Sequence, residues 1–148
     1  MRIYKTSEQL GAAMMRKIEM QKNEIKVFVY GTLMNSRSNH SYIKEQKLIG
    51  EARLDDYEMY NVRSYPGIVP KGGEYILGEL YEVSSEVLKR LDKLEGEGYL
   101  YRRITAKVRV NSEEYEAYAY IWLGSTEGCR KVTVKEMPWK PVRVRCEE

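Results

Sequence analysis

Glu95 is the first residue whose position could support chemistry. It ends an amphipathic run and directly precedes Gly96. If this run is a helix, the Glu95 carboxyl lies at the negative end of the helix dipole, next to apolar side chains, and both surroundings disfavour its ionised form. A carboxyl whose pKa is raised toward neutrality suits proton transfer. The alternative is a solvated glutamate at a helix end, which is the commoner case.

The tetrapeptide Tyr30-Gly31-Thr32-Leu33 is the second candidate, and it follows an alternating apolar run. Glycine allows a sharp turn of the backbone or a close approach to a ligand. Successive amide groups after such a turn can hold an anion. An ordinary glycine between a strand and a loop explains the same residues, and the tetrapeptide by itself favours that interpretation.

Three weaker candidates surround these two segments. Tyr101, in a stretch from residue 99 to 103, follows Glu95 so closely that its hydroxyl could reach the carboxyl or cover a substrate. The alternative is a tyrosine at a strand edge. Tyr65-Pro66-Gly67 could form a rigid lip beside a pocket, although proline turns are common. His40, the single histidine, is expected to cap a helix or lie on the surface.

The alternating residues Tyr118, Tyr120 and Trp122 are expected in the core.

Composition excludes several other kinds of site. A chain with one histidine cannot form a histidine-rich metal centre, and Cys129 and Cys146 lack the spacing of a zinc knuckle or a redox pair. We therefore expect no metal site and two free thiols, with a bond between them as the alternative. A hydrolase based on cysteine or serine would need His40 as its base and is the least favoured enzyme class.

Length and charge limit the class of protein. The chain has 148 residues, a mass of 17.4 kDa and a formal net charge of +3, from 25 basic and 22 acidic residues. This length fits one domain that needs neither metal nor disulfide to fold. The two signs of charge are interspersed, so no nucleic-acid partner is expected. Neither a membrane-spanning run nor a secretory signal is visible, so we expect a cytoplasmic protein with no membrane partner.

The elements that position these residues can be predicted from periodicity. Residues 1–24 are predicted to form a helical extension, because Thr6 and Gln9 have capping-box spacing and apolar residues recur every four positions. The apolar stripe of this helix would pack on the domain or on a second copy of the chain, so a homodimer is one expectation. Residues 25–148 are predicted to form the domain itself.

Strands dominate the pattern after residue 24. Helices are expected from Ser38 or Asn39 to just before Gly50, and from Ser84 or Ser85 to Glu95. Prolines in residues 65–70 indicate an edge strand or a loop, and Gly72-Gly73 indicates a tight turn. Period-two alternation predicts strands in the ranges 25–30, 51–54, 57–62, 75–83, 103–110, 115–123, 132–134 and 142–144. The fold class is therefore α+β, with the sheet curled into a small barrel.

Four motifs together resemble the gamma-glutamylcyclotransferase-like superfamily over about residues 25–123. They are Val29-Tyr30-Gly31-Thr32-Leu33, Tyr65-Pro66-Gly67-Ile68, Gly78-Glu79-Leu80-Tyr81-Glu82-Val83, and Leu91-Asp92-Lys93-Leu94-Glu95-Gly96 with Tyr101 and Arg103 after it. The resemblance implies a small mixed β-barrel flanked by helices, a pocket at one end of the barrel and no cofactor.

The resemblance also implies roles for particular residues. Backbone amides of the loop formed by Tyr30, Gly31, Thr32 and Leu33 would hold the alpha-carboxylate of a gamma-glutamyl small molecule. Glu95 would be the acid and base that cyclises it to 5-oxoproline, and Tyr101 would lie near the pocket. Residues 34–38 lack the Arg-x-Gly often found there, which leaves the choice of substrate open. A non-catalytic binding or assembly module of the same fold is the alternative.

Overall fold

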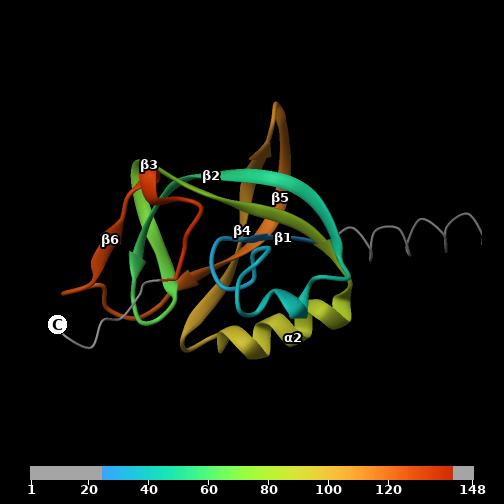
Figure 1. The fold of residues 1–148 in the computed structure, drawn as a ribbon, viewed down its shortest axis with the longest axis horizontal. Helices are drawn as coiled ribbons and strands as arrows, with labels where there is room; N and C mark the ends of the chain where they lie inside the picture. The colour runs from blue at the N-terminus through green and yellow to red at the C-terminus, as the bar shows by residue number, and fades with distance from the viewer. Residues whose placement is uncertain (1–24, 142–148) are drawn as a thin grey trace, which may run out of the picture.

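Residues 25–141, which the computed structural model describes, form strands wrapped around a common core with a helix on their outside (Figure 1). The elements, in chain order, are β1 (Ile25–Val29), the 3-10 turn η1 (His40–Tyr42), β2 (Lys47–Asn61), β3 (Pro66–Val83), the helix α2 (Ser85–Glu95), β4 (Tyr101–Val110), β5 (Glu113–Trp122), β6 (Arg130–Val132) and the 3-10 turn η2 (Val134–Glu136). The predicted helix over 1–24, the predicted strand over 142–144 and Cys146 lie outside the described residues.

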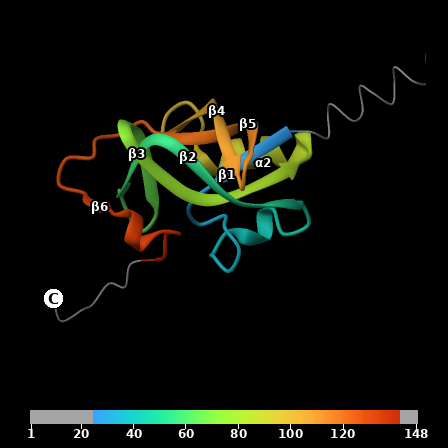
Figure 2. The ribbon, with the colours of Figure 1, turned by 90° about the horizontal axis from the view of Figure 1, so that it is seen from above.

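Five strands close into a barrel. Their order is β3-β1-β5-β4-β2, and β2 also pairs with β3, which completes the ring. The β1–β5 pair is parallel and the other pairs are antiparallel, so the barrel is mixed. Strand β6 extends the sheet beyond the ring by pairing with β2. Figures 1 and 2 show β2 and β3 side by side along most of their length. The predicted α+β fold with a small mixed barrel is confirmed.

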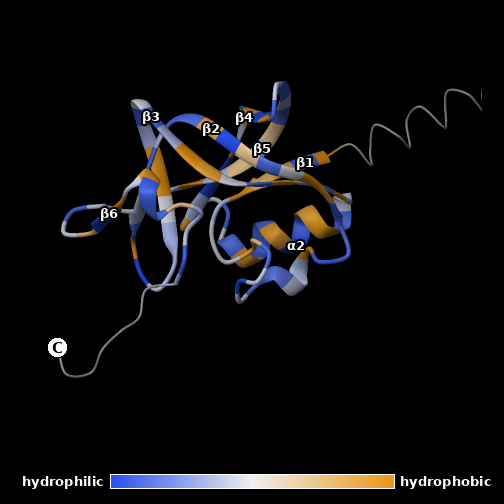
Figure 3. Ribbon diagram, turned by 45° about the horizontal axis from the view of Figure 1, so that its top comes forward, coloured by the Kyte–Doolittle hydropathy of each residue, from blue (hydrophilic) through white to orange (hydrophobic). Residues whose placement is uncertain are grey.

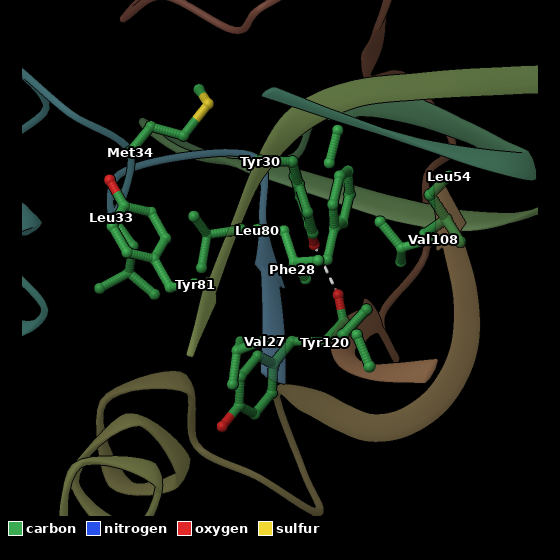
Figure 4. Close-up of a cluster of buried hydrophobic side chains, with 14 of the residues drawn as sticks. Val27, Phe28, Tyr30, Leu33, Met34, Leu54, Leu80, Tyr81, Val108 and Tyr120 are labelled. Atoms are coloured by element: carbon green, nitrogen blue, oxygen red, sulfur yellow. Dashed lines mark hydrogen bonds between the residues drawn. The ribbon is translucent and has the colours of Figure 1, made fainter. Parts of the chain in front are cut away.

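The core is built by the strand residues that point inward. Phe28 and Leu80 are completely buried inside the barrel, where Figure 4 shows them with Leu54 and Val108. Val27 is also completely buried, but it points to the opposite face of β1. Apolar and polar residues alternate along the strands in Figure 3, as expected for strands with one face in a core. Burial of this apolar surface is the main stabilising contribution to the barrel.

Helix α2 has the boundaries that its sequence predicts. The Ser84 hydroxyl caps its start by accepting a hydrogen bond from the Val87 amide at 3.2 Å. The buried residues Val87, Leu88 and Leu91 form its apolar stripe. Gly96 has a φ of 59°, in the left-handed region that ends helices, so Glu95 is the last helical residue.

The predicted helix between Ser38 and Gly50 is wrong. Only the short turn η1 forms there, and β2 already begins at Lys47. Asn39 holds the chain in a loop, because its amide N–H donates to the Thr32 carbonyl at 2.8 Å and its side chain donates to the Thr32 hydroxyl at 2.9 Å. Pairing of Lys47 and Leu48 with β3 then draws the next residues into the barrel.

The predicted short strands over 51–54, 57–62 and 75–83 are parts of two long strands. Strand β2 runs through an irregularity at Asp56, whose φ is 72°, and β3 bulges opposite it. Gly72-Gly73 therefore forms part of this bulge and does not reverse the chain, and the Gly73 amide donates to the Asp56 side chain. Pro66 begins the portion of β3 that pairs with β2 alone, so the edge-strand alternative is correct.

The segments after β5 are short. Strand β6 shares only Val132 with the predicted strand over 132–134, because Val134 already begins the turn η2. Beyond η2, Trp139 is buried against the barrel. No helix within residues 25–141 combines the length and apolarity that crossing a bilayer requires.

Candidate active site

A cavity of about 180 Å³ lies where the end of β1, the end of α2 and the starts of β3 and β4 meet. Its wall includes all six residues that the sequence predicts as site residues, namely Tyr30, Gly31, Thr32, Leu33, Glu95 and Tyr101. The cavity is smaller than the 300 Å³ or so at which pockets for drug-sized ligands begin. It therefore suits a small ligand fragment of amino-acid size.

Glu95 lies in the last turn of α2, and its side chain forms part of the cavity wall. Burial raises the pKa of its carboxyl from 4.5 to about 7. Among residues 25–141, no side chain or backbone group forms a hydrogen bond or an ion pair with that carboxyl. A carboxyl withdrawn from water and left without a partner is available to exchange a proton with a ligand.

Gly31 is required by packing rather than by an unusual backbone angle. A Cβ atom at this position would lie 2.7 Å from the Pro66 Cγ atom, which is closer than carbon atoms can approach without displacement. The proline ring of β3 therefore lies directly against the backbone of the loop after β1. This contact fixes the distance between the loop and the wall that carries Tyr101, because the Tyr101 hydroxyl donates to the Pro66 carbonyl at 2.6 Å.

The loop from Gly31 to Asn39 is closed on itself. The Met34 amide donates to the Gly31 carbonyl at 3.1 Å, and both Asn39 donors return to Thr32. The amide N–H groups of Gly31, Thr32 and Leu33 have no acceptor within the described part of the chain. Unpaired successive amides at a cavity wall are suited to an anionic group of a ligand.

Tyrosines form much of the remaining wall. Burial first, and then the neighbouring Tyr101 and Glu95, raise the pKa of Tyr30 well above its usual value. Burial and the nearby Glu95 carboxylate raise the pKa of Tyr101 in the same way. The Tyr101 ring packs edge-on against Trp122, with ring centres 5.2 Å apart. These phenols are therefore neutral at any pH at which Glu95 titrates.

Asp92 precedes Glu95 by one helical turn and anchors the end of α2 to the barrel. One carboxylate oxygen accepts from the Tyr120 hydroxyl at 2.6 Å, and the other pairs with the Arg103 guanidinium at 2.6 Å. Residues three apart on a helix share a face, so these bonds also orient Glu95 toward the barrel.

Other sequence candidates lie at different places. Tyr65 and Pro66 line the cavity, whereas Gly67 packs against Trp122. Tyr99 is 78% exposed and does not contribute to the cavity wall. His40 is half-buried outside the cavity, with its Nδ1 atom 3.0 Å from the Leu33 carbonyl oxygen.

Sequence reasoning missed three contributors to the site. Asn39 lines the cavity and fixes Thr32, and Asp92 holds Tyr120. Tyr120 belongs to the core as predicted, since it is 2% exposed, but it also lines the cavity. The signal that could have found Asp92 is its place three residues before Glu95, on the same helix face.

Comparisons with known proteins found several relatives of this chain. The family model for "Gamma-glutamyl cyclotransferase, AIG2-like" matches residues 27–141. The "Gamma-glutamylcyclotransferase family protein YtfP" of Escherichia coli strain K12 is 29% identical over 108 residues, which cover 73% of this chain and 91% of the relative. The "Gamma-L-glutamyl-butirosin B gamma-glutamyl cyclotransferase" of Niallia circulans is 35% identical over 103 residues, covering 65% of both chains.

A solved structure shares the fold. An AIG2-like protein from Mus musculus superposes with a TM-score of 0.67 at 20% identity, over 82% of this chain and 98% of the mouse chain. At this identity the likeness concerns the barrel alone.

Proposed function

The chain belongs to the gamma-glutamyl cyclotransferase, AIG2-like family, and from that premise we propose that it converts a gamma-glutamyl amine or peptide into 5-oxoproline and the free amine. The observation that carries this proposal is that the Glu95 carboxyl, which has no hydrogen-bond partner among the described residues, lines the same small cavity as the unpaired backbone amides of Gly31, Thr32 and Leu33. The first group can move a proton and the second can hold a carboxylate.

The proposed reaction needs few catalytic groups because the substrate contains its own nucleophile. The alpha-amine attacks the gamma-carbonyl carbon of the same molecule and closes a five-membered lactam. The bond from that carbon to the leaving nitrogen then breaks. Such an intramolecular reaction depends mainly on holding the chain in a folded conformation, and good orientation of this kind can contribute roughly 7–11 kcal/mol.

Glu95 would transfer the protons. Its carboxylate takes one proton from the alpha-ammonium, which frees the nitrogen lone pair for attack, and later gives that proton to the departing nitrogen. The attacking nitrogen loses a second proton as the lactam forms, and the released amine takes up a proton to leave as an ammonium ion. No water is consumed and no enzyme-bound intermediate forms. A pKa of about 7 suits both steps, because the carboxyl can gain and lose a proton near neutral pH.

The loop after β1 would position the substrate. The amides of Gly31, Thr32 and Leu33 would bind the alpha-carboxylate and leave the gamma-carbonyl near Glu95. The contact between Gly31 and the Pro66 ring supports this assignment, since it holds the loop against the opposite wall of the cavity.

The experiment is a mass-spectrometric assay for 5-oxoproline with gamma-glutamyl dipeptides, gamma-glutamyl amines and glutathione. We expect at least one of them to turn over, with Glu95→Gln lowering kcat by roughly a hundredfold or more. Glu86→Gln is the matched control, because Glu86 lies exposed on the same helix. The kcat/KM of the wild type should rise with pH through about 7.

Two results would contradict the proposal. Full activity in Glu95→Gln would exclude that residue as the acid and base. Binding of a panel member without any turnover would leave the alternative, a non-catalytic small-molecule-binding module of the same fold.

A further inference from the structure

The guanidinium of Arg63 lies behind the aromatic part of the cavity wall. Tyr65 and Tyr101 line the cavity, and both pack against the Trp122 ring, with distances of 6.4 and 5.2 Å between ring centres. The Arg63 guanidinium lies over the same Trp122 ring, 6.0 Å from its centre, at the outer limit of a cation–π contact. One aromatic ring therefore separates this positive charge from two residues of the cavity wall.

The charge of Arg63 has no carboxylate partner within residues 25–141. Its amide N–H donates to the Tyr65 carbonyl at 3.3 Å, which holds the residue in the turn between β2 and β3, and the residue is exposed. Other arginines of this range pair with carboxylates, namely Arg53, Arg103, Arg109 and Arg130. The Arg63 guanidinium is therefore available to an anionic group of a ligand.

The charges of Arg63 and Glu95 act on the same part of the cavity wall. Burial raises the pKa of the Tyr101 phenol, the Glu95 carboxylate raises it further, and the Arg63 charge opposes both. Both charged groups are thus close enough to the Tyr101 hydroxyl to influence its ionisation. Within the described part of the chain, Glu95 is the only charged residue that lines the cavity, so Arg63 supplies the positive charge nearest to that end.

The size of the cavity decides which part of a substrate meets Arg63. A volume of about 180 Å³ accommodates a fragment of amino-acid size, which in the proposed reaction is the glutamyl part. The leaving nitrogen has to lie within reach of the Glu95 carboxyl, which returns a proton to it. The substituent on that nitrogen therefore leaves the cavity at the end formed by Glu95 and Tyr101, beside the rings that carry Arg63.

We propose that Arg63 is a specificity-determining residue, which favours substrates whose leaving amine carries a carboxylate next to the scissile nitrogen. The inference rests on the proposed function and narrows its substrates to gamma-glutamyl amino acids, in preference to gamma-glutamyl polyamines. A guanidinium binds a carboxylate through two parallel hydrogen bonds, whereas it repels the ammonium group of a polyamine. Because Arg63 is exposed, the preference should be severalfold and should weaken as salt is added.

The test compares three compounds that differ only in the group next to the leaving nitrogen. In gamma-L-glutamyl-L-alanine this group is a carboxylate, and in gamma-L-glutamyl-L-alaninamide it is a neutral carboxamide of the same shape. In the gamma-glutamyl amide of 1,2-diaminopropane, linked through its second nitrogen, it is an ammonium. The wild-type kcat/KM for release of 5-oxoproline should favour the carboxylate about fivefold over the carboxamide, and by more over the ammonium.

Variants at Arg63 locate this preference and correct for the different basicities of the three leaving amines. Arg63→Gln should lower the ratio of carboxylate to carboxamide about fivefold, Arg63→Lys should keep most of it, and Arg63→Glu should shift the order toward the ammonium compound. Arg90→Gln is the matched control, because it removes the same charge from an exposed position of α2 outside the cavity wall.

Binding is measured apart from turnover. Calorimetric Kd values of the three compounds are determined for Glu95→Gln with and without Arg63→Gln, or for the wild type and Arg63→Gln if the wild type releases no 5-oxoproline. The carboxylate compound should bind about fivefold more tightly than the carboxamide when Arg63 is present, and less than about twofold when it is replaced.

The same ratio in the wild type and in Arg63→Gln would overturn the inference, as would binding of none of the three compounds at millimolar concentration. These results are separate from the fate of the proposed function. Release of 5-oxoproline with a ratio that does not depend on Arg63 would remove this inference alone. A preference in Kd that depends on Arg63, without any release of 5-oxoproline, would remove the proposed reaction alone.

Discussion

At the scale of a single residue, the surroundings of Glu95 favour proton transfer but lower the stability of the fold. Its partial burial suits proton exchange, but a carboxyl that is withdrawn from water without a hydrogen-bond partner is unfavourable for folding when it is ionised. Both effects follow from one raised pKa. Function and stability at this position should therefore respond in opposite directions to the same substitution.

Glu95→Gln should stabilise the protein at alkaline pH. The folded-state pKa is raised from 4.5 to about 7, so the folded protein binds the proton more tightly than the unfolded chain does. The contribution of this group is complete below about pH 4.5 and is lost as pH rises through 7, which corresponds to roughly 3 kcal/mol. The glutamine has no such loss. Urea denaturation should show Glu95→Gln gaining on the wild type between pH 4.5 and pH 8.5, by an amount of this order.

The same comparison needs Glu86→Gln as its control, because that exposed residue should show no such gain. A stability difference between Glu95→Gln and the wild type that is the same at both pH values would contradict the assignment of a raised pKa.

The contact between the Gly31 backbone and the Pro66 ring leads to a second prediction for single residues. Gly31→Ala should cost about 1–3 kcal/mol, because the new Cβ would overlap the Pro66 ring. Adding Pro66→Ala to Gly31→Ala should recover part of that loss, as a double-mutant cycle in denaturant would show. Gly72→Ala, with open space around its Cβ position, should stay close to the wild type. Simple additivity of the two substitutions would disprove the contact.

The position of Glu95 could be predicted from sequence because its helix has strong local signals. A serine cap, an apolar stripe and a terminal glycine all act within a few residues of Glu95. The burial that shifts the pKa could not be predicted with the same certainty, because the cavity that Glu95 lines is shared with Tyr101 and Tyr120 from later strands. The sequence motif points to the backbone freedom of Gly31, whereas the contact with the Pro66 ring is the physical reason that this position has no side chain.

At the scale of elements, the end of α2 is held by a connection to β4 and β5. Arg103→Ala should lower the free energy of unfolding by about 1–2 kcal/mol, because it leaves the half-buried Asp92 with Tyr120 as its remaining partner. The neighbouring Arg102→Ala, at an exposed position on the same strand, should have little effect. Chemical denaturation of both variants checks this prediction, and equal losses would show that the ion pair contributes nothing specific.

The elements that the sequence mispredicts are those decided by distant partners. Residues 38–50 have a helix-like composition, but Thr32 holds Asn39 in a loop and β3 pairs with residues from Lys47 onward. Gly72-Gly73 has the composition of a hairpin turn, yet the reversal lies at residues 62–65, where the Val62 amide donates to the Tyr65 carbonyl. Local preference yields to strand pairing at both places.

At the scale of the whole molecule, the segment after η2 ties separate parts of the barrel together. Buried Trp139 donates from its indole N–H to the Asn61 side chain at 2.8 Å, and its carbonyl accepts from the Arg37 side chain at 2.8 Å. Asn61 ends β2, and Arg37 lies in the loop that follows the candidate site. The C-terminal segment thus connects the sheet with the loop that lines the cavity.

Trp139→Ala should cost about 3–5 kcal/mol through the cavity that it leaves, and Trp139→Phe clearly less. Amide hydrogen exchange in residues 32–39 should accelerate in Trp139→Ala, since the Arg37 anchor loses its fixed acceptor. Unchanged exchange in that loop would show that the segment stabilises the barrel without reaching the site.

The closed barrel brings the ends of β1, α2, β3 and β4 to one cavity, and this convergence is the basis of the proposed chemistry. The most direct test is to run the reaction in H₂¹⁸O with an active gamma-glutamyl compound and to weigh the products. The proposed reaction should yield 5-oxoproline without ¹⁸O, in an amount equal to that of the released amine, because the nucleophile is the alpha-amine of the substrate. Glutamate carrying ¹⁸O would show that water is the nucleophile, and would exclude the proposed cyclisation.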